Sequence, residues 1–371
     1  MNPRERVLRT IRGQTADRVP LVIHGFSYSS RDQVKKVDDP LHQKIAERII
    51  DKTDFRVVVP SYINRMLVTP PQRIRTAHKN LPNGNRRTFG LIDTPLGELN
   101  YVTEWDPRVG TSWTVKYPVE NEADVKKIAS IPWERPEKLA PPDPDRLPDD
   151  FSQRGILSTS ISSPFVCVAG MMEYERFLEL CGMDLDLIKE LTGICRQRVL
   201  DCVSVLLSKP GIEYVWMGGS EWVTPPMGSP MLYDALVQEQ ERSIIQYVHE
   251  NSNAVVHVHC HGHVRDALPK TIERGADFTE PVEPPPDGDI TMAEAKKIVA
   301  GRITLGGNIE CRILCNESEE AVETAVRAAF EGGKERFILS TTAEPSPRLS
   351  QVEFANYMRM IDVWEELSPL E

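Results

Sequence analysis

The sequence predicts an α/β fold: a (β/α)8 TIM barrel with an antiparallel, β-rich insertion between its second and third strands. Short apolar runs alternate with longer segments of helical periodicity, which is the pattern of βαβ units around a parallel sheet. Eight such runs occur in the 371 residues. One stretch, at about residues 63–150, breaks the alternation and is rich in Thr, Pro, Gly and aromatic residues. We therefore expect one domain over residues 1–371 with an inserted subdomain.

The barrel strands are predicted from runs of β-branched and aromatic residues. Helices are predicted where apolar residues recur every three or four positions. The predicted strands are 18–24, 54–59, 155–160, 214–218, 254–260, 276–280, 302–306 and 336–340. The predicted helices are a short amphipathic one at the amino terminus and those at 41–51, 185–207, 231–250, 265–273, 317–330 and 351–364.

The insertion has a different pattern. Segments 88–92, 97–105 and 111–117 are predicted as short antiparallel strands, followed by a helix at 123–128 and a proline-rich loop over 136–148. With few uninterrupted helices, the stretch is too small for a separate domain. We expect a subdomain that packs on the barrel as a lid.

Charge and composition limit the partners. A net charge of −11 and a pI near 5.4 argue against nucleic acid, because phosphate binding needs a basic surface. No window approaches 18 apolar residues, so no membrane span is expected, and the amino terminus lacks the apolar core of a signal peptide. The cytoplasm is the expected location. The seven cysteines include no Cys-x-x-Cys pair and fit a reduced protein, and the spacing of Cys311 and Cys315 is only a weak indication of metal.

Four of the eight histidines fall within seven residues: His257, His259, His261 and His263. Side chains two apart on a strand share a face, so two imidazoles about 6–7 Å apart can bind one metal ion. His259 and His261 are the predicted ligands and catalytic residues. His257 lies deeper in the strand, where a structural hydrogen bond is the simpler role, and His263 follows the strand end.

Carboxylates at neighbouring strand ends could complete the site, because chemistry in such barrels gathers at the carboxyl ends of the strands. A catalytic Zn²⁺ needs three protein ligands and one open position. Glu221, after the fourth strand, and Glu283, after the sixth, are the candidate third ligands, and Glu221 is also a catalytic candidate. Glu344, after the eighth strand, is held in reserve.

Several segments together resemble the uroporphyrinogen decarboxylase superfamily, which includes the cobalamin-dependent methyltransferases. They are Arg4-Glu-Arg-Val-Leu8 with Asp17-Arg-Val-Pro20, Thr94-Pro-Leu-Gly97, Tyr117-Pro118 and Thr304-Leu-Gly-Gly-Asn-Ile309. The resemblance covers most of the chain and implies a (β/α)8 barrel. It also implies that Gly307 and Asn308 contact a cofactor.

Two branches of the superfamily can be compared with the chain. Porphyrin decarboxylases carry Arg-Gln-Ala-Gly-Arg-Tyr after the first strand, where this chain has His24-Gly-Phe-Ser-Tyr-Ser-Ser. The methyltransferases bind Zn²⁺ through His-x-Cys on the fifth strand and a distant cysteine. Aligned on Gly262, these ligands fall on His259, on His261 and near Ala343. A nitrogen- and oxygen-ligated zinc suits an oxygen-bearing substrate.

The sequence thus predicts a zinc-dependent methyltransferase that moves a methyl group between a small methoxylated or methylated substrate and a corrinoid. No Asp-x-His-x-x-Gly corrinoid-binding stretch occurs, so a partner protein would carry the corrinoid. A homodimer is a further expectation. Two alternatives stay open: a decarboxylase or lyase that uses the histidines as acid and base, and a non-catalytic barrel that binds a tetrapyrrole or metal.

Overall fold

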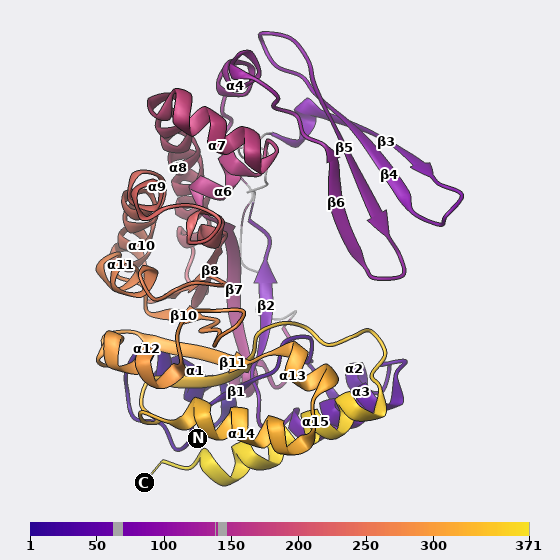
Figure 1. The fold of residues 1–371 in the computed structure, drawn as a ribbon, viewed down its shortest axis with the longest axis vertical. Coiled ribbons are helices and arrows are strands. Elements are labelled where there is room, and N and C mark those ends of the chain that lie inside the picture. Colours follow the sequence, from indigo (N-terminus) through magenta and orange to yellow (C-terminus); the bar gives the residue numbers. More distant parts are fainter. Residues whose placement is uncertain (62–69, 138, 140–146, 371) are drawn as a thin grey trace.

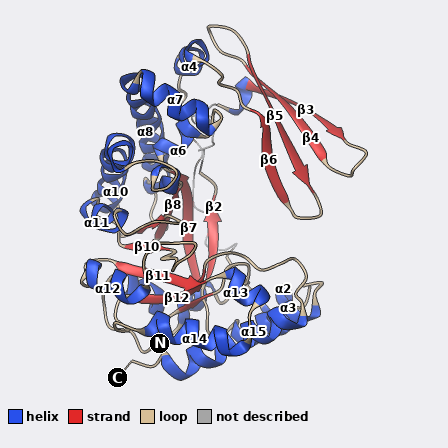
Figure 2. Cartoon of the chain, in the orientation of Figure 1, coloured by secondary structure: helices blue, strands red, loops and turns tan. Residues whose placement is uncertain are grey.

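The computed structural model describes residues 1–61, 70–137, 139 and 147–370. Figure 1 shows a curled sheet of parallel strands surrounded by helices, with a second, antiparallel sheet standing away from it at one end. Figure 2 shows that the helices gather around the parallel sheet, while no helix covers the outer strands of the antiparallel one. In the chain, the antiparallel strands follow β2 and precede β7.

Eight parallel strands form the main sheet in the order β1-β12-β11-β10-β9-β8-β7-β2. Every residue of β11 and β12 is buried, as expected for parallel strands covered on both faces. The strand order is that of a TIM-barrel-like fold. The bounds are β1 Leu21–Val22, β2 Phe55–Val59, β7 Gly155–Ser162, β8 Tyr214–Gly218, β9 Val255–His259, β10 Phe278–Glu280, β11 Thr304–Ile309 and β12 Phe337–Thr341.

The sheet is open between β1 and β2. Within the described residues, each of these strands pairs on one side only, β1 with β12 and β2 with β7. The expectation of a fully closed barrel is therefore corrected to a curled sheet with one unpaired edge. At this edge β1 has only two residues, and both pair with β12.

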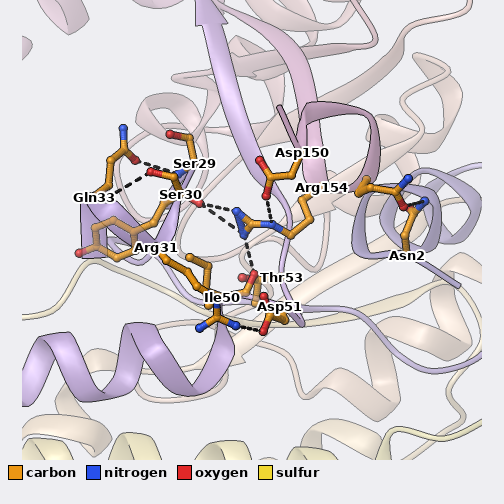
Figure 3. A network of polar contacts seen from close by, with 12 residues as sticks. Asn2, Ser29, Ser30, Arg31, Gln33, Ile50, Asp51, Thr53, Asp150 and Arg154 are labelled. Atoms are coloured by element: carbon orange, nitrogen blue, oxygen red, sulfur yellow. Dashed lines mark hydrogen bonds and ion pairs between the residues drawn. The ribbon is translucent and has the colours of Figure 1, made fainter. Parts of the chain in front are cut away.

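A buried arginine bridges the unpaired edge (Figure 3). The Arg154 guanidinium donates to the carbonyl oxygen of Tyr28, beyond β1, at 2.9 Å and to that of Ile50, before β2, at 2.5 Å. Its Nε donates to Asp150 at 2.9 Å. A side chain thus connects the two segments where no backbone ladder does.

Each predicted helix has a counterpart, but the prediction missed the described helices at 31–34, 151–154, 164–169, 174–183, 292–299 and 311–316. In segment 231–250, a π-helical turn at Asp234–Gln238 separates α9 from α10. The helices are α1 Pro3–Ile11, α2 Arg31–Val34, α3 Pro40–Ile49, α4 Glu122–Ala129, α5 Phe151–Arg154, α6 Pro164–Ala169, α7 Tyr174–Met183, α8 Leu185–Leu207, α9 Pro230–Tyr233, α10 Glu239–Asn251, α11 Ala267–Glu273, α12 Met292–Val299, α13 Cys311–Asn316, α14 Glu319–Phe330 and α15 Gln351–Leu367. Short 3-10 turns lie at Pro71–Arg73 and Ser220–Val223.

The antiparallel sheet has the order β3-β4-β5-β6. Its strands are β3 Ile74–Asn80, β4 Arg86–Ile92, β5 Leu99–Asp106 and β6 Thr111–Lys116. The prediction missed β3, whose residues are mostly polar and six of them exposed. Residues 63–69 of the predicted insertion, and 138 and 140–146 of its proline-rich loop, lie outside the described residues.

The amino-terminal end of the parallel barrel is filled by α1. Its residues Val7, Leu8 and Ile11 form a separate apolar cluster with one residue from each of five strands. These strand residues are Ile156, Tyr214, Val255, Phe278 and Ile338. The cluster identifies the inward face of these five strands. It fills the amino-terminal end of the barrel, so polar groups can gather at the opposite, carboxyl end. No helix in the described part of the chain is both long and apolar enough to span a membrane.

Candidate functional site

The inward face of β9 carries Val255, His257 and His259. Val255 packs against α1 in the inner cluster, and side chains two apart on a strand share a face, so both histidines also face the interior. His257 is 2% exposed, and His259, at the end of β9, is partly exposed. The strand therefore places an apolar residue and then two imidazoles in line from the closed end of the barrel toward its mouth.

Glu280, the last residue of β10, is the acceptor that these histidines share. Its Oε1 lies 2.8 Å from His259 Nδ1 and 3.4 Å from His257 Nε2, and its Oε2 lies 3.3 Å from His24 Nε2. Only 4% of its side chain is exposed. Burial acts to raise the pKa of Glu280, but its contacts with the imidazoles of His24, His257 and His259 outweigh burial and hold that pKa well below its usual range. Glu280 is therefore a buried carboxylate surrounded by three imidazoles.

His257 is held by Tyr214 of β8. The Tyr214 hydroxyl lies 2.7 Å from His257 Nδ1, and both side chains are buried. Burial lowers the pKa of His257 to about 4, although Glu280 acts in the opposite direction. The ring is therefore neutral at pH 7, which is the form in which histidine binds metal. Arg56 of β2 stacks on the Tyr214 ring, with its guanidinium carbon 4.0 Å from the ring centre.

His257, His259 and Glu280 have the geometry of a metal centre. One donor atom from each lies within 4.8 Å of the other two. His257 Nε2 is buried and makes no hydrogen bond that meets the usual geometry, so this atom has a lone pair or a proton without a good partner. Two imidazole nitrogens and one carboxylate are a known donor set for catalytic Zn²⁺, which keeps a fourth position open. The residues present therefore fit a divalent ion.

The predicted ligands His261 and Glu283 form a separate pair next to this centre. His261 Nδ1 lies 3.0 Å from Glu283 Oε1, and Glu283 Oε2 accepts the Gly262 backbone N–H at 2.6 Å. Burial acts to lower the pKa of His261, but Glu283 outweighs it and the pKa is raised. The His259 and His261 ring centres are 4.6 Å apart. The two predicted histidines are thus neighbours, each with its own glutamate.

The other predicted residues lie around the same end of the barrel. Glu221 is in the 3-10 turn after β8, and its buried Oε2 has no hydrogen-bond partner among the described residues. Glu344 lines the cavity described below. Gly307 and Asn308 are buried within β11. None of these four joins the cluster of His257, His259 and Glu280.

Sequence reasoning missed the central role of Glu280 and the contribution of His24. Glu280 is the last residue of the sixth predicted strand, whereas the sequence analysis proposes Glu283 and Glu221 as ligands. The deciding information is register: Glu280 pairs with His259 across the parallel ladder of β9 and β10. Aligning the last residues of two adjacent predicted strands would have brought Glu280 beside His259.

A cavity of about 530 Å³ lies at the unpaired edge between β1 and β2. It is lined by Val22, Ile23, His24, Gly25, Phe26, Ser27, Thr53, Asp54, Arg56, Val58, Ser158, Ser160, Tyr214, Trp216 and Glu344. A smaller cavity of about 40 Å³ is lined by His257 and Glu280, and it shares His24, Arg56 and Trp216 with the larger one. A small molecule in the large cavity would therefore lie beside the histidine–glutamate cluster.

The fold and the site define a class of protein: a parallel α/β barrel with a buried histidine–carboxylate centre at the carboxyl ends of its strands. The family model described as uroporphyrinogen decarboxylase (URO-D) matches residues 114–367, more than half of the chain. The chain therefore belongs to the uroporphyrinogen decarboxylase family, as the resemblance indicated.

One solved structure supports this fold. A methyltransferase from Methanosarcina mazei is similar with a TM-score of 0.60 and 13% identity, covering 99% of each chain. A B12-independent methionine synthase from Shewanella sp. W3-18-1, in complex with selenomethionine, has a TM-score of 0.39 and 10% identity. That match covers 80% of this chain and 78% of the synthase. No curated protein matches the chain in sequence.

Proposed function

We propose that the protein is a zinc-dependent methyltransferase of the uroporphyrinogen decarboxylase family. It would move a methyl group between a small methoxylated or methylated substrate and a corrinoid that a partner protein carries. The similarity in fold to a methyltransferase from Methanosarcina mazei supports this class of reaction. The absence of an Asp-x-His-x-x-Gly stretch from the sequence favours a separate corrinoid carrier.

The observation that carries the proposal is the cluster of His257, His259 and Glu280 beside a cavity large enough for a small molecule. We assign these three residues as metal ligands. This set shares His259 with the ligands predicted from sequence. His261 and Glu283, which pair with each other, are assigned to the rim of the site rather than to the ion.

Zn²⁺ held there would act as a Lewis acid on an ether or alcohol oxygen of the substrate. The protein supplies the rest. Tyr214 fixes the orientation of the His257 ring, and His24 holds the second carboxylate oxygen of Glu280. Trp216 lines both cavities, and its ring centre lies 5.1 Å from that of His259. His261, raised in pKa and partly exposed, is placed to exchange a proton with a substrate oxygen at the rim.

Metal analysis of the purified protein tests the ligands. We expect His259→Ala to bind about one equivalent of zinc less than the wild type, because two ligands cannot hold the ion tightly. His249→Ala is the matched control, since His249 also pairs with a carboxylate, Asp277, at 2.8 Å but on α10 outside the barrel. Full zinc occupancy in His259→Ala would remove the proposed site.

A transfer assay tests the reaction. Free cob(I)alamin is the acceptor, small methyl ethers and methylamines are the donors, and methylation is followed by the visible spectrum of the corrinoid. Turnover that is lost in His259→Ala and kept in His249→Ala supports the proposal. Release of CO₂ from a small carboxylated substrate without corrinoid would instead indicate the decarboxylase or lyase alternative. Binding of metal or tetrapyrrole without any turnover would indicate a non-catalytic barrel.

A further inference from the structure

One arginine lies inside the barrel, next to the histidine–glutamate cluster but not part of it. Arg56 is the second residue of β2 and pairs in register with Ile156 of β7, which belongs to the apolar cluster around α1. Paired residues of neighbouring strands lie on the same face of a sheet, so Arg56 also faces the interior. It lines both the large cavity and the small one beside His257 and Glu280. A positive charge therefore stands near the closed, amino-terminal end of the large cavity.

The guanidinium of Arg56 keeps donors that its neighbours do not use. Its carbon lies 4.0 Å from the ring centre of Tyr214, and its Nε lies 3.5 Å from Asp54 Oδ2, which is longer than an ordinary hydrogen bond. Arginine carries five N–H donors in a planar fork. One ring and one distant carboxylate cannot engage all five, and 24% of the side chain is exposed. The remaining donors are therefore placed for an anionic group that enters the cavity.

The rest of the cavity lining suits a carboxylate in particular. Ser158 and Ser160 of β7 add hydroxyl donors. Of the two acidic residues in the lining, Asp54 faces Arg56, and Glu344 is exposed after β12, at the mouth of the cavity. A single cation beside these acids suits a monoanion, because a dianion would bring a second charge without a partner. A planar carboxylate also matches the guanidinium fork, which can donate two parallel hydrogen bonds to it.

The strand register also orients a molecule bound at Arg56. On β9, Val255 shares the apolar cluster with Ile156, and His259 follows four residues later, which is a rise of about 13 Å along the strand. A carboxylate at Arg56 would therefore lie at the deep end of the cavity. The opposite end of the same molecule would point toward His259 and the carboxyl ends of the strands.

We propose that Arg56 binds a carboxylate of the substrate, so that the methoxylated or methylated substrate is a small monocarboxylic acid. The methyl-bearing group lies at the opposite end of that molecule. The inference rests on the proposed function for the methyl group, and on the cavity for the carboxylate. Arg56 determines specificity: it contacts the substrate but takes no part in the transfer, and the carboxylate stays on the product.

Calorimetric titration with matched acids and amides tests the carboxylate. The probes are methoxyacetate, 3-methoxypropanoate and 4-methoxybenzoate, each compared with its neutral amide. They are added to the full-length protein after removal of metal, so that no acid binds through zinc. In the wild type, we expect at least one acid to bind about tenfold more tightly than its amide, or better, because a hydrogen bond between two charged groups is stronger than one to a neutral group.

Two variants assign the preference to Arg56. Arg56→Gln should abolish it, because the substitution removes the charge and the fork. Arg86→Gln is the matched control and should keep the preference of the wild type. Arg86 also lies over an aromatic ring, that of Trp105 at 5.2 Å, but it belongs to β4 of the antiparallel sheet.

The other outcomes overturn the inference. They are equal binding of acids and amides by the wild type, and a preference that survives in Arg56→Gln. If Arg56→Gln does not fold, Arg56→Lys takes its place: it keeps the charge without the fork, so the preference should fall severalfold, and an unchanged preference would count against the role of Arg56. The titration needs neither zinc nor corrinoid, so a failure of methyl transfer would not alter it. Equal binding of acids and amides would in turn leave the proposed metal centre intact.

Discussion

The parallel barrel and the antiparallel sheet differ in where they put their apolar side chains. In the barrel, β11 and β12 are buried along their whole length. In the antiparallel sheet, four apolar residues on β4 and β6 are 37–44% exposed: Phe89, Leu91, Trp113 and Val115. The strands of this sheet are held mainly by their own ladders. Burial of apolar side chains therefore stabilises the barrel, which holds the candidate site, more than it stabilises the antiparallel sheet.

The two regions also differ in charge. Residues 73–116 contain seven Lys or Arg and four Asp or Glu, although the whole chain has a net charge of −11. Inside the barrel, by contrast, the buried Glu280 carboxylate lies in contact with three histidines. A buried charge is costly unless it is paired, whereas an exposed one is not. Substitutions in the barrel should consequently have larger effects than substitutions in the antiparallel sheet.

The largest effect is expected at a buried ion pair between α10 and α11. Arg274 Nε lies 3.2 Å from Glu241 Oε2, and at most 1% of either side chain is exposed. Arg274→Met should lower the free energy of unfolding by about 3–5 kcal/mol, because it leaves a buried carboxylate without its partner. Urea denaturation measures the change. Arg274→Met/Glu241→Met should recover much of the loss, and a double variant as unstable as the single one would show that packing, not charge, dominates.

The next effect concerns the metal centre. Tyr214→Phe removes the hydroxyl that orients His257 and should weaken zinc binding by about 10–100-fold, which is typical for loss of a partner of a metal-binding histidine. Competition with a chelator measures the affinity. Tyr174→Phe is the control, since the Tyr174 hydroxyl donates to backbone carbonyls far from the ligands in sequence. Equal affinity in wild type and Tyr214→Phe would mean that Tyr214 does not hold the ring.

A smaller effect depends on pH and lies on the outer side of the barrel. The hydrogen bond to Asp277, reinforced by its charge and opposed by burial, raises the pKa of His249 above the value of about 6.5 in the unfolded chain. The pair therefore stabilises the fold fully below about pH 6.5 and loses this contribution as pH rises through the raised pKa. Since His249 is 37% exposed, the contribution should stay below about 1 kcal/mol.

The measurement is the difference in unfolding free energy between wild type and His249→Gln at pH 5.5 and at pH 8.5, on either side of the transition. The difference should be larger at the lower pH. A difference that grows with pH would contradict the assigned direction of the shift.

The smallest effect is expected in the antiparallel sheet. Trp113 is 43% exposed on the edge strand β6, so Trp113→Ser should change the free energy of unfolding by less than about 0.5 kcal/mol. Replacing Phe165, which is fully buried in the barrel core, with Ala should cost about 3–5 kcal/mol and is the comparison. A large loss in Trp113→Ser would mean that the exposed face is covered in solution.

Much of the barrel could be predicted, because each strand corresponds to a short continuous run of β-branched and apolar residues. The fourth strand was placed with the bounds of β8, and helix 185–207 with those of α8. The strand β3 was missed because its exposed residues carry no apolar pattern. The break in segment 231–250 was missed because a π-helical turn changes the hydrogen bonding without a glycine or proline to mark it.

The site was predicted only in part. His259 on β9 could be proposed as a ligand from the two-residue periodicity of a strand, which depends only on neighbouring residues. The choice among Glu221, Glu280 and Glu283 depends on the register between strands, which no single segment encodes. His24 is more than 250 positions from Glu280 in the sequence, and only the order and curl of the sheet bring the two side chains together.

The unpaired edge between β1 and β2 affects how reactants reach the site. The cavity there is lined by residues of both edge strands, and it shares His24, Arg56 and Trp216 with the small cavity beside Glu280. A small molecule that enters at this open edge would reach the histidine–glutamate cluster from the side of the sheet, without passing between the strand ends.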